Sequence, residues 1–372
     1  MNILIIGEFS AFAKNLAKGF NRLGGNRIVV ISGGDSFKKI EQDENSIVFP
    51  EPRNLSLFGL RIPKTKGLSS FFLHLKTRKI VKEFSSNFDV VFLMNVGFIR
   101  RKPDLHSPYF TVDEINRMRR EQSVVIMSSC GADLPFFKFA VNDKRFSTVY
   151  KDLSITHNPI YAEKEKLALK IVDAVIPMSY QYAEAYRLYG KDFRLLKAIQ
   201  LPFDNQSVNS SHVYHKDKIV IFNGSLRPTK GTIFIEEALK IVEDKYSDRV
   251  IIRKDRLPYS QFLELLPEID LYVDLCTDYD YGMSAIAAMS AGCVVFSGNE
   301  PETRKEFGID AIPVVPISPS LEDIVIKISL FLDNIDEIER VGVQSRLYVE
   351  KYHDCSLVAN KYLGVFKDLL KN

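Results

Sequence analysis

One loop of the sequence combines residue types that could bind a phosphate group. The segment Asn223-Gly224-Ser225-Leu226-Arg227-Pro228-Thr229-Lys230-Gly231 lies between an apolar run at 218–223 and an amphipathic stretch at 232–246. Its two cations, Arg227 and Lys230, stand at a strand-to-helix turn, where main-chain N–H groups and the positive end of a helix favour an anion. The loop therefore predicts a diphosphate site. A solvated basic loop is the alternative interpretation.

A second loop could approach the same anion. The segment Asp278-Tyr279-Asp280-Tyr281-Gly282-Met283-Ser284 leads into a helix of small residues that is predicted at 283–291. Gly282 would let the first-turn amides of that helix come close to a ligand. Alternatively, the small residues serve packing and the acidic loop is solvated. We interpret Asp278 and Asp280 as loop acids rather than metal ligands, and we expect no metal site.

Several other chemistries lack support. The sequence has no G-x-G-x-x-G after a first strand, no G-x-x-x-x-G-K-[ST], no G-x-S-x-G and no H-x-x-x-H. Its four cysteines lack metal-type spacing, which indicates a reducing compartment. The 50 Lys and Arg nearly balance the 47 Asp and Glu, with a pI of 8.4, so a dedicated nucleic-acid binder is not expected. No window is apolar enough to span a bilayer.

The elements that would position these loops form two similar halves. The chain opens with an apolar strand, the turn Gly7-Glu8-Phe9-Ser10, a helix at 11–23 and a strand at 27–32, which together predict a βαβ unit. Further strands are predicted in the first half at 46–49, 89–94, 123–129 and 174–178, with a helix at 161–172.

A polar segment at 204–212 separates the halves, and the opening pattern then recurs. The second half has predicted strands at 218–223, 250–253, 271–274, 293–297 and 311–315, and helices at 232–246, 259–266, 283–291 and 321–332. We therefore expect an α/β protein of two doubly wound Rossmann-like domains facing a cleft, with ligands at the carboxyl ends of the strands. The boundaries are 1–212 and 213–353, and the closing helical segment 345–371 returns to the first domain, to which we assign residues 354–372.

The order of these segments resembles the large family of retaining glycosyltransferases with the GT-B fold, family 4. Members open their second domain with a glycine loop that carries Arg and Lys and ends in Lys-Gly, as at 224–231. Their E-G-F-G…E-A-M-A-x-G-x-P-V-V signature is similar to 281–295. Further similar segments are Leu257–Leu266, Ile269–Asp274, Cys130-Gly131-Ala132-Asp133, which resembles H-G-[ST]-D, and 172–179.

The resemblance implies transfer of a sugar from a UDP- or GDP-linked donor to a glycan or lipid-linked acceptor, with retention and without a metal or separate cofactor. Bacterial surface polysaccharide or glycoconjugate biosynthesis is the setting that it implies. The implied catalytic residues are Asp133, Asp278 and Asp280. The implied donor contacts are Gly7, Ser10, Gly224, Ser225, Arg227, Lys230, Pro258, Tyr259, Tyr279, Gly282, Met283 and Ser284.

The sequence departs from the family pattern at its most informative positions. Tyr279 and Ala287 replace the two acids of E-x7-E, which in the family contact the donor sugar and the ribose. Cys130 replaces the cleft histidine and Ser225 an arginine. Asp278 or Asp280 could serve the sugar instead, but Ala287 cannot bind ribose, so we expect weak donor affinity. A non-catalytic relative that has lost the donor site is the main alternative, and a nucleotide-sugar epimerase of similar shape is a weaker one.

Two further features have two interpretations each. Residues 61–82 carry seven basic residues, no acid and interleaved apolar residues, which fits a contact with an anionic membrane surface or a solvated helix face. Arg100-Arg101-Lys102 could extend that patch. Asp133 could orient the acceptor or act as a helix N-cap. We expect a cytoplasmic protein that could contact the inner face of the membrane through this basic patch.

Overall fold

The computed structural model describes most of the chain. It covers residues 1–35, 38–41, 46–48, 56–57, 60–61, 66–101, 109–131, 133–143, 145, 159–190, 193–209, 212, 214 and 217–371, with only the main chain for 48, 56–57, 60–61 and 66–73.

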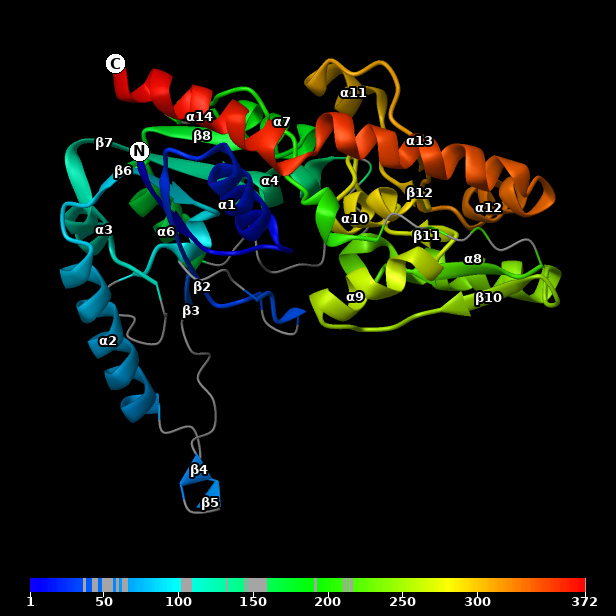
Figure 1. Cartoon of the computed structure of the whole chain (residues 1–372), viewed down its shortest axis with the longest axis horizontal. Helices are drawn as coiled ribbons and strands as arrows, with labels where there is room; N and C mark the ends of the chain where they lie inside the picture. The colour runs from blue at the N-terminus through cyan, green and yellow to red at the C-terminus, as the bar shows by residue number, and fades with distance from the viewer. Residues whose placement is uncertain are drawn as a thin grey trace.

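The first half of the chain forms a six-stranded parallel sheet in the order β3-β2-β1-β6-β7-β8 (Figure 1). Its strands are β1 (Asn2–Ile6), β2 (Arg27–Ser32), β3 (Ser46–Val48), β6 (Phe88–Leu93), β7 (Arg119–Ser129) and β8 (Ala174–Pro177). The four residues Ile3–Ile6 are fully buried. Helices cover both faces of such a sheet, so its strands are continuous apolar runs, and the sequence shows that pattern.

The helices of this half are α1 (Phe12–Leu23), α2 (Lys66–Glu83), α3 (Val112–Met118), α4 (Leu134–Asn142), α6 (Pro159–Leu169) and α7 (Tyr180–Tyr189), with a short turn η2 (Val96–Phe98). A small antiparallel hairpin, β4 (Ser56–Leu57) and β5 (Leu60–Arg61), precedes α2.

The second half forms a five-stranded parallel sheet in the order β10-β9-β11-β12-β13. Its strands are β9 (Ile219–Asn223), β10 (Val250–Arg253), β11 (Leu271–Val273), β12 (Val294–Ser297) and β13 (Val314–Pro316). Its helical elements are η5 (Pro228–Lys230), α8 (Thr232–Lys245), α9 (Tyr259–Leu265), η6 (Leu266–Glu268), α10 (Met283–Ala291), α11 (Pro301–Phe307), α12 (Leu321–Asp333) and α13 (Asp336–Tyr352).

The closing helix α14 (Cys355–Lys371) returns to the first sheet, as predicted (Figure 1). It packs along α1, where Gly19 allows close approach: a Cβ there would lie 2.0 Å from the carbonyl oxygen of Cys355. The rings of Tyr362 and Phe366 pack against Phe92, with centroids 5.4 and 6.0 Å away.

The closing segment that was predicted to be helical over 345–371 contains two helices, because α13 ends at Tyr352 and α14 begins at Cys355. The two chain segments that connect the sheets pair at this break. Phe203 donates its N–H to the carbonyl of His353 at 2.6 Å, and Cys355 donates to the carbonyl of Phe203 at 2.9 Å. Asp354 then caps α14 by accepting the N–H of Ser356 at 2.9 Å.

The predicted elements agree well with the observed ones. The ranges 27–32, 250–253 and 283–291 are the same, and most of the others differ by one to three residues at an end. Asp204, predicted to start the linker, is instead buried against α1, where Lys18 and Arg22 bind its carboxylate at 2.5 and 2.6 Å. The domain boundary at 212 and 213 stays a prediction. No helix within the described part of the chain is long and apolar enough to cross a bilayer.

Candidate functional site

The predicted phosphate loop follows β9 and leads through η5 into α8. Gly224 packs on Tyr272, where a Cβ would lie 2.3 Å from the tyrosine oxygen. Ser225 is buried, and its N–H and hydroxyl both donate to Oδ1 of Asn223, at 3.0 and 2.6 Å. These two residues therefore shape the loop from within. Arg227 is exposed, and among the described residues its guanidinium has no hydrogen-bond or ion-pair partner.

Lys230 joins this loop to α10. Its ammonium donates to Oδ1 of Asp274 at 2.5 Å, to the carbonyl of Gly224 at 3.2 Å and to the hydroxyl of Ser284 at 3.5 Å. Asp274 is fully buried after β11 and also accepts from Ser284 at 2.9 Å and from Ser297 at 3.2 Å. The structure thus brings the two predicted loops together. Sequence reasoning treated Asp274 as the last residue of a strand and missed its role.

The start of α10 is open to a ligand. Gly282 is its N-cap residue and supplies no side-chain hydrogen bond, and a Cβ at Gly282 would meet no atom within 4 Å. Met283 is buried and Ser284 half-buried, whereas Ala287 is only 1% exposed. The first-turn N–H groups beside Ser284 can therefore meet an anion, and the position of the family's ribose acid is packed inside.

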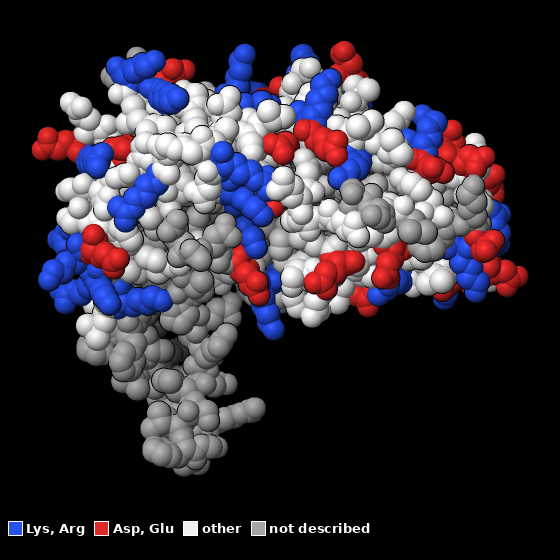
Figure 2. All heavy atoms as spheres, in the orientation of Figure 1, with Lys and Arg blue, Asp and Glu red and all other residues white. Residues whose placement is uncertain are grey.

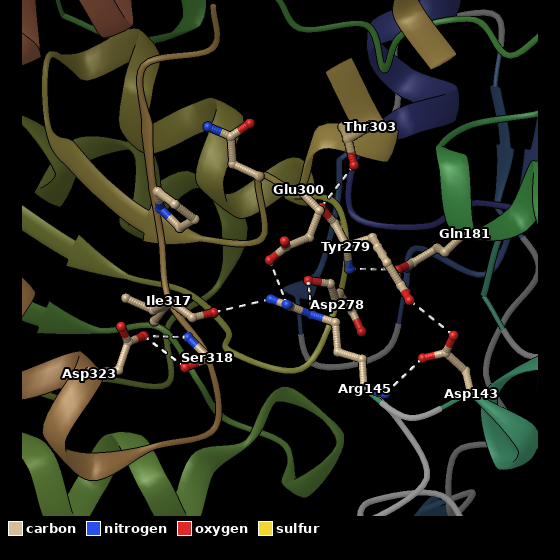
Figure 3. A network of polar contacts seen from close by, with 12 residues as sticks. Asp143, Arg145, Gln181, Asp278, Tyr279, Glu300, Thr303, Ile317, Ser318 and Asp323 are labelled. Atoms are coloured by element: carbon tan, nitrogen blue, oxygen red, sulfur yellow. Dashed lines mark hydrogen bonds and ion pairs between the residues drawn. The ribbon is translucent and has the colours of Figure 1, made fainter. Parts of the chain in front are cut away.

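The acidic loop contacts the first domain instead (Figure 3). Oδ2 of Asp280 accepts the N–H of Gln181 at 3.1 Å, in the first turn of α7. The hydroxyl of Tyr279 donates to Asp143 at 3.0 Å, and its N–H to the side chain of Gln181 at 3.3 Å. Burial raises the pKa of Asp280 to about 6. Asp280 and Tyr279 therefore join the domains, and neither hydrogen-bonds to the phosphate loop.

Arg145 reinforces this contact, and no motif in the sequence marked it. Its Nε donates to the carbonyl of Asp278 at 3.0 Å and its Nη2 to the carbonyl of Ile317 at 3.1 Å (Figure 3). Its Nη1 pairs with Glu300 at 2.5 Å. One side chain of the first domain thereby binds loops that follow three neighbouring strands of the second sheet, β11, β12 and β13.

Asp278 is the other acid of this loop, and its carboxyl group is buried as well. Its Oδ1 is buried and has no hydrogen-bond partner among the described residues. Burial raises its pKa to about 7, and the charges of Asp280 and Asp274 add to the effect. Its carboxyl group can therefore exchange a proton near neutral pH.

The first-domain turn is closed by its own residues. Gly7 has φ of 103° and packs on Phe98, where a Cβ would lie 2.4 Å from the ring. The carboxylate of Glu8 accepts the N–H groups of Ala13 and Lys14 at 3.2 and 3.0 Å, so it occupies the N-terminus of α1. Ser10 bonds to Asp35 through its N–H at 2.7 Å.

Asp133 is the N-cap of α4, which confirms the second interpretation. Its Oδ1 accepts the N–H of Phe136 at 2.8 Å and its Oδ2 the hydroxyl of Tyr186 at 3.1 Å. It is buried, which raises its pKa to about 7. Burial also raises the pKa of the neighbouring Cys130 thiol well above its ordinary value, so the thiol stays protonated.

Pro258 is the N-cap residue of α9, and Tyr259 is its first residue. Burial raises the pKa of Tyr259 well above its usual range, and the charges of Glu8 and Asp204 in the first domain contribute to the increase.

All four cysteines are buried free thiols. Within the described ranges, no group of three or more His, Cys, Asp and Glu is arranged to hold a metal ion.

No family model matches the sequence, and no curated protein matches it significantly. Solved structures do. HepE of Anabaena, in complex with UDP and glucose, is 13% identical with a TM-score of 0.61, over 99% of this chain and 100% of that one. Sucrose-phosphate synthase of Thermosynechococcus elongatus is 13% identical with a TM-score of 0.63, over 100% of both chains. The G117R mutant of TarM from S. aureus, solved in a complex that includes UDP, is 12% identical with a TM-score of 0.64, over 98% of this chain and 99% of that one.

The fold is that of the GT-B glycosyltransferases. The predicted fold class is thereby confirmed, including the helix that returns to the first domain. Identities near 13% establish the fold alone, so the activity must be argued from the residues of this chain.

Proposed function

We propose that the protein is a glycosyltransferase that moves a sugar from a UDP- or GDP-linked donor to a glycan or lipid-linked acceptor. One observation carries the proposal: the loop with Arg227 and Lys230 meets the open N-terminus of α10 at the carboxyl ends of β9 and β11. In a doubly wound sheet this is the edge where ligands bind. Cations and free N–H groups together suit a diphosphate.

The same groups would assist the reaction. As the bond from the sugar to the diphosphate breaks, negative charge grows on the leaving group, and preorganised donors stabilise it. Arg227, with its unpaired guanidinium, and the amides beside Ser284 would supply that stabilisation. We assign the sugar contact to Asp278 rather than to Asp133 or Asp280, because both oxygens of Asp133 and Oδ2 of Asp280 already accept hydrogen bonds from the first domain. Retention at the anomeric carbon follows from the family resemblance.

No metal is part of this proposal. Asp278 and Asp280 form the acidic pair nearest a metal-binding motif, but Asp280 is turned toward α7, so the pair does not converge. Arg227 and the N–H groups at the start of α10 would supply the positive potential that a divalent cation would otherwise supply beside the diphosphate.

Contact with a membrane surface is a further part of the proposal. Leu75, Arg78, Lys79 and Lys82 are exposed on α2, and Figure 2 shows basic side chains gathered over the end of α2 beside α3. Exposed cations of this kind attract anionic lipids. Arg100 does not extend this patch, because it is buried and its guanidinium binds Glu114 at 2.6 Å. Residues 62–65 and 102 lie outside the described residues.

Calorimetric titration with UDP, GDP and nucleotide sugars tests the proposal. We expect binding of one of them, and we expect Arg227→Ala to weaken it at least tenfold while leaving thermal unfolding unchanged, because an exposed charge contributes little to stability. Lys240→Ala, on the exposed part of α8, is the matched control. Equal affinity of the Arg227 variant and the wild type would contradict the assignment.

A second candidate function is a non-catalytic relative with this fold. The observation that favours it is the use of Tyr279 and Asp280 for contact between the domains, together with the buried Ala287. This function predicts no binding of any nucleotide sugar and no release of UDP or GDP on incubation with acceptors.

A further inference from the structure

Asp274 is a buried carboxylate in contact with both parts of the proposed phosphate site. It is fully buried after β11, at the centre of the second sheet. Its Oδ1 accepts a hydrogen bond from Lys230 at 2.5 Å and another from Ser284 at 2.9 Å. Ser297 donates to its Oδ2 at 3.2 Å. The carboxylate thus already holds the two side-chain donors that a diphosphate would use.

The donors of Lys230 are fully occupied. An ammonium group has three N–H bonds and no acceptor. The partners of Lys230 number three: Asp274, the carbonyl of Gly224 and the hydroxyl of Ser284. Ser284 in turn donates its hydroxyl to Asp274. A phosphate oxygen can therefore bind Lys230 or Ser284 only by replacing a partner that the protein supplies.

The charges lead to the same conclusion. The positive charge of Lys230 and the negative charge of Asp274 cancel at the site, which leaves Arg227 as the uncompensated charge of the loop. Without the charge of Asp274, Lys230 would attract an incoming phosphate, and the low dielectric of a buried site would strengthen that attraction.

We propose that Asp274 is an internal anion that competes with the donor diphosphate for Lys230 and Ser284, and so lowers the affinity of the site. The inference rests on the proposed function. It distinguishes Asp274 from a residue that merely supports the loop, because removal of a support weakens binding, whereas removal of a competitor strengthens it.

The test is Asp274→Asn, which keeps the shape of the side chain and removes its charge. We expect it to bind UDP, GDP and inorganic pyrophosphate about tenfold more tightly than the wild type at low salt, and we expect the gain to shrink at high salt. Ser297→Ala is the control, because it removes another partner of Asp274 without touching Lys230. Unchanged or weaker binding by Asp274→Asn would overturn the inference.

A second pair of variants covers the case in which Asp274→Asn does not fold. Lys230→Met leaves Asp274 buried without its cation, and Lys230→Met with Asp274→Asn removes both charges together. The double variant should unfold at a higher temperature than Lys230→Met and bind pyrophosphate more tightly. Weaker binding by the double variant would contradict competition.

The results separate this inference from the proposed function. If Asp274→Asn gains affinity for pyrophosphate while neither protein binds UDP or GDP, the inference stands and the donor assignment fails. If the wild type binds UDP or GDP and Asp274→Asn gains nothing, the donor assignment stands and the inference fails. If neither the wild type nor Asp274→Asn binds any of the three probes, both fail.

Discussion

Replacement of Arg145 by Ala should lower the free energy of unfolding by about 2–4 kcal/mol and loosen the contact between the domains. The two bonds to the carbonyls of Asp278 and Ile317, at 3.0 and 3.1 Å, have a charged donor and contribute about 1.5 kcal/mol each. The ion pair with Glu300 is partly exposed, with side chains 15% and 26% accessible, and adds about 0.5–1 kcal/mol. Water that reaches the freed carbonyls reduces the total.

Urea unfolding followed by circular dichroism measures the loss, and small-angle X-ray scattering measures the separation of the domains. Arg187→Ala is the matched control, because Arg187 also joins the domains, through Glu306 of α11, but its side chain is 43% exposed. We expect it to cost less than about 1 kcal/mol. Arg145→Lys should fall between the two, since an ammonium cannot reproduce the planar fork of bonds.

Equal losses for Arg145→Ala and Arg187→Ala would refute this reasoning. That result would mean that water satisfies the carbonyls of Asp278 and Ile317 as well as the guanidinium does. An unchanged radius of gyration in Arg145→Ala would show that the remaining contacts hold the domains together without it.

Three further predictions concern the same region. Burial raises the pKa of Asp280 from 3.8 to about 6, so the folded protein binds this proton more tightly than the unfolded chain does, and the free energy of unfolding falls as pH rises from about 4 to 6. Asp280→Asn should remove up to about 3 kcal/mol of this fall between pH 4 and 7, measured by urea unfolding at each pH. An equal fall in both proteins would contradict the assignment. Gly224→Ala places a methyl group 2.3 Å from the oxygen of Tyr272 and should cost about 1–3 kcal/mol in thermal unfolding, whereas Gly282→Ala, which meets open space, should cost less than half as much. Ala287→Glu buries a charge at a position that is 1% exposed and should destabilise the fold by several kcal/mol; a stable variant that binds UDP more tightly would show instead that the helix can present a ribose ligand.

The sequence was sufficient for the fold because parallel strands covered on both faces are uninterrupted apolar runs. The residues 27–32 could be delimited in this way, and Gly24 and Gly292 mark the ends of α1 and α10. The contact made at the break between α13 and α14 could not be predicted. His353 pairs there with Phe203, which is 150 residues earlier in the chain, and no local signal records that contact.

The candidate site was predictable in its main-chain parts and less so in its side chains. The loops at 224–231 and 278–284 could be located because glycines and charged residues that directly follow an apolar strand are visible in the sequence itself. Arg145 was missed because two of its partners are carbonyl oxygens, 133 and 172 residues away. The family resemblance implies that Tyr279 contacts the donor and that Asp280 is catalytic. Their contacts with Asp143 and Gln181 could not be predicted, because these partners belong to the other domain.

The return of α14 has a consequence for folding during synthesis. The first sheet is made first, yet its apolar face is completed by Tyr362 and Phe366, which follow the whole second sheet in the chain. Until residues 355–371 leave the ribosome, Phe20 and Phe92 lack the rings that cover them. The second domain can close its own core earlier, which reverses the N-terminal-first order common in multidomain chains. A nascent chain stopped before residue 355 therefore presents exposed apolar surface to chaperones, although the strands of both sheets have already been made.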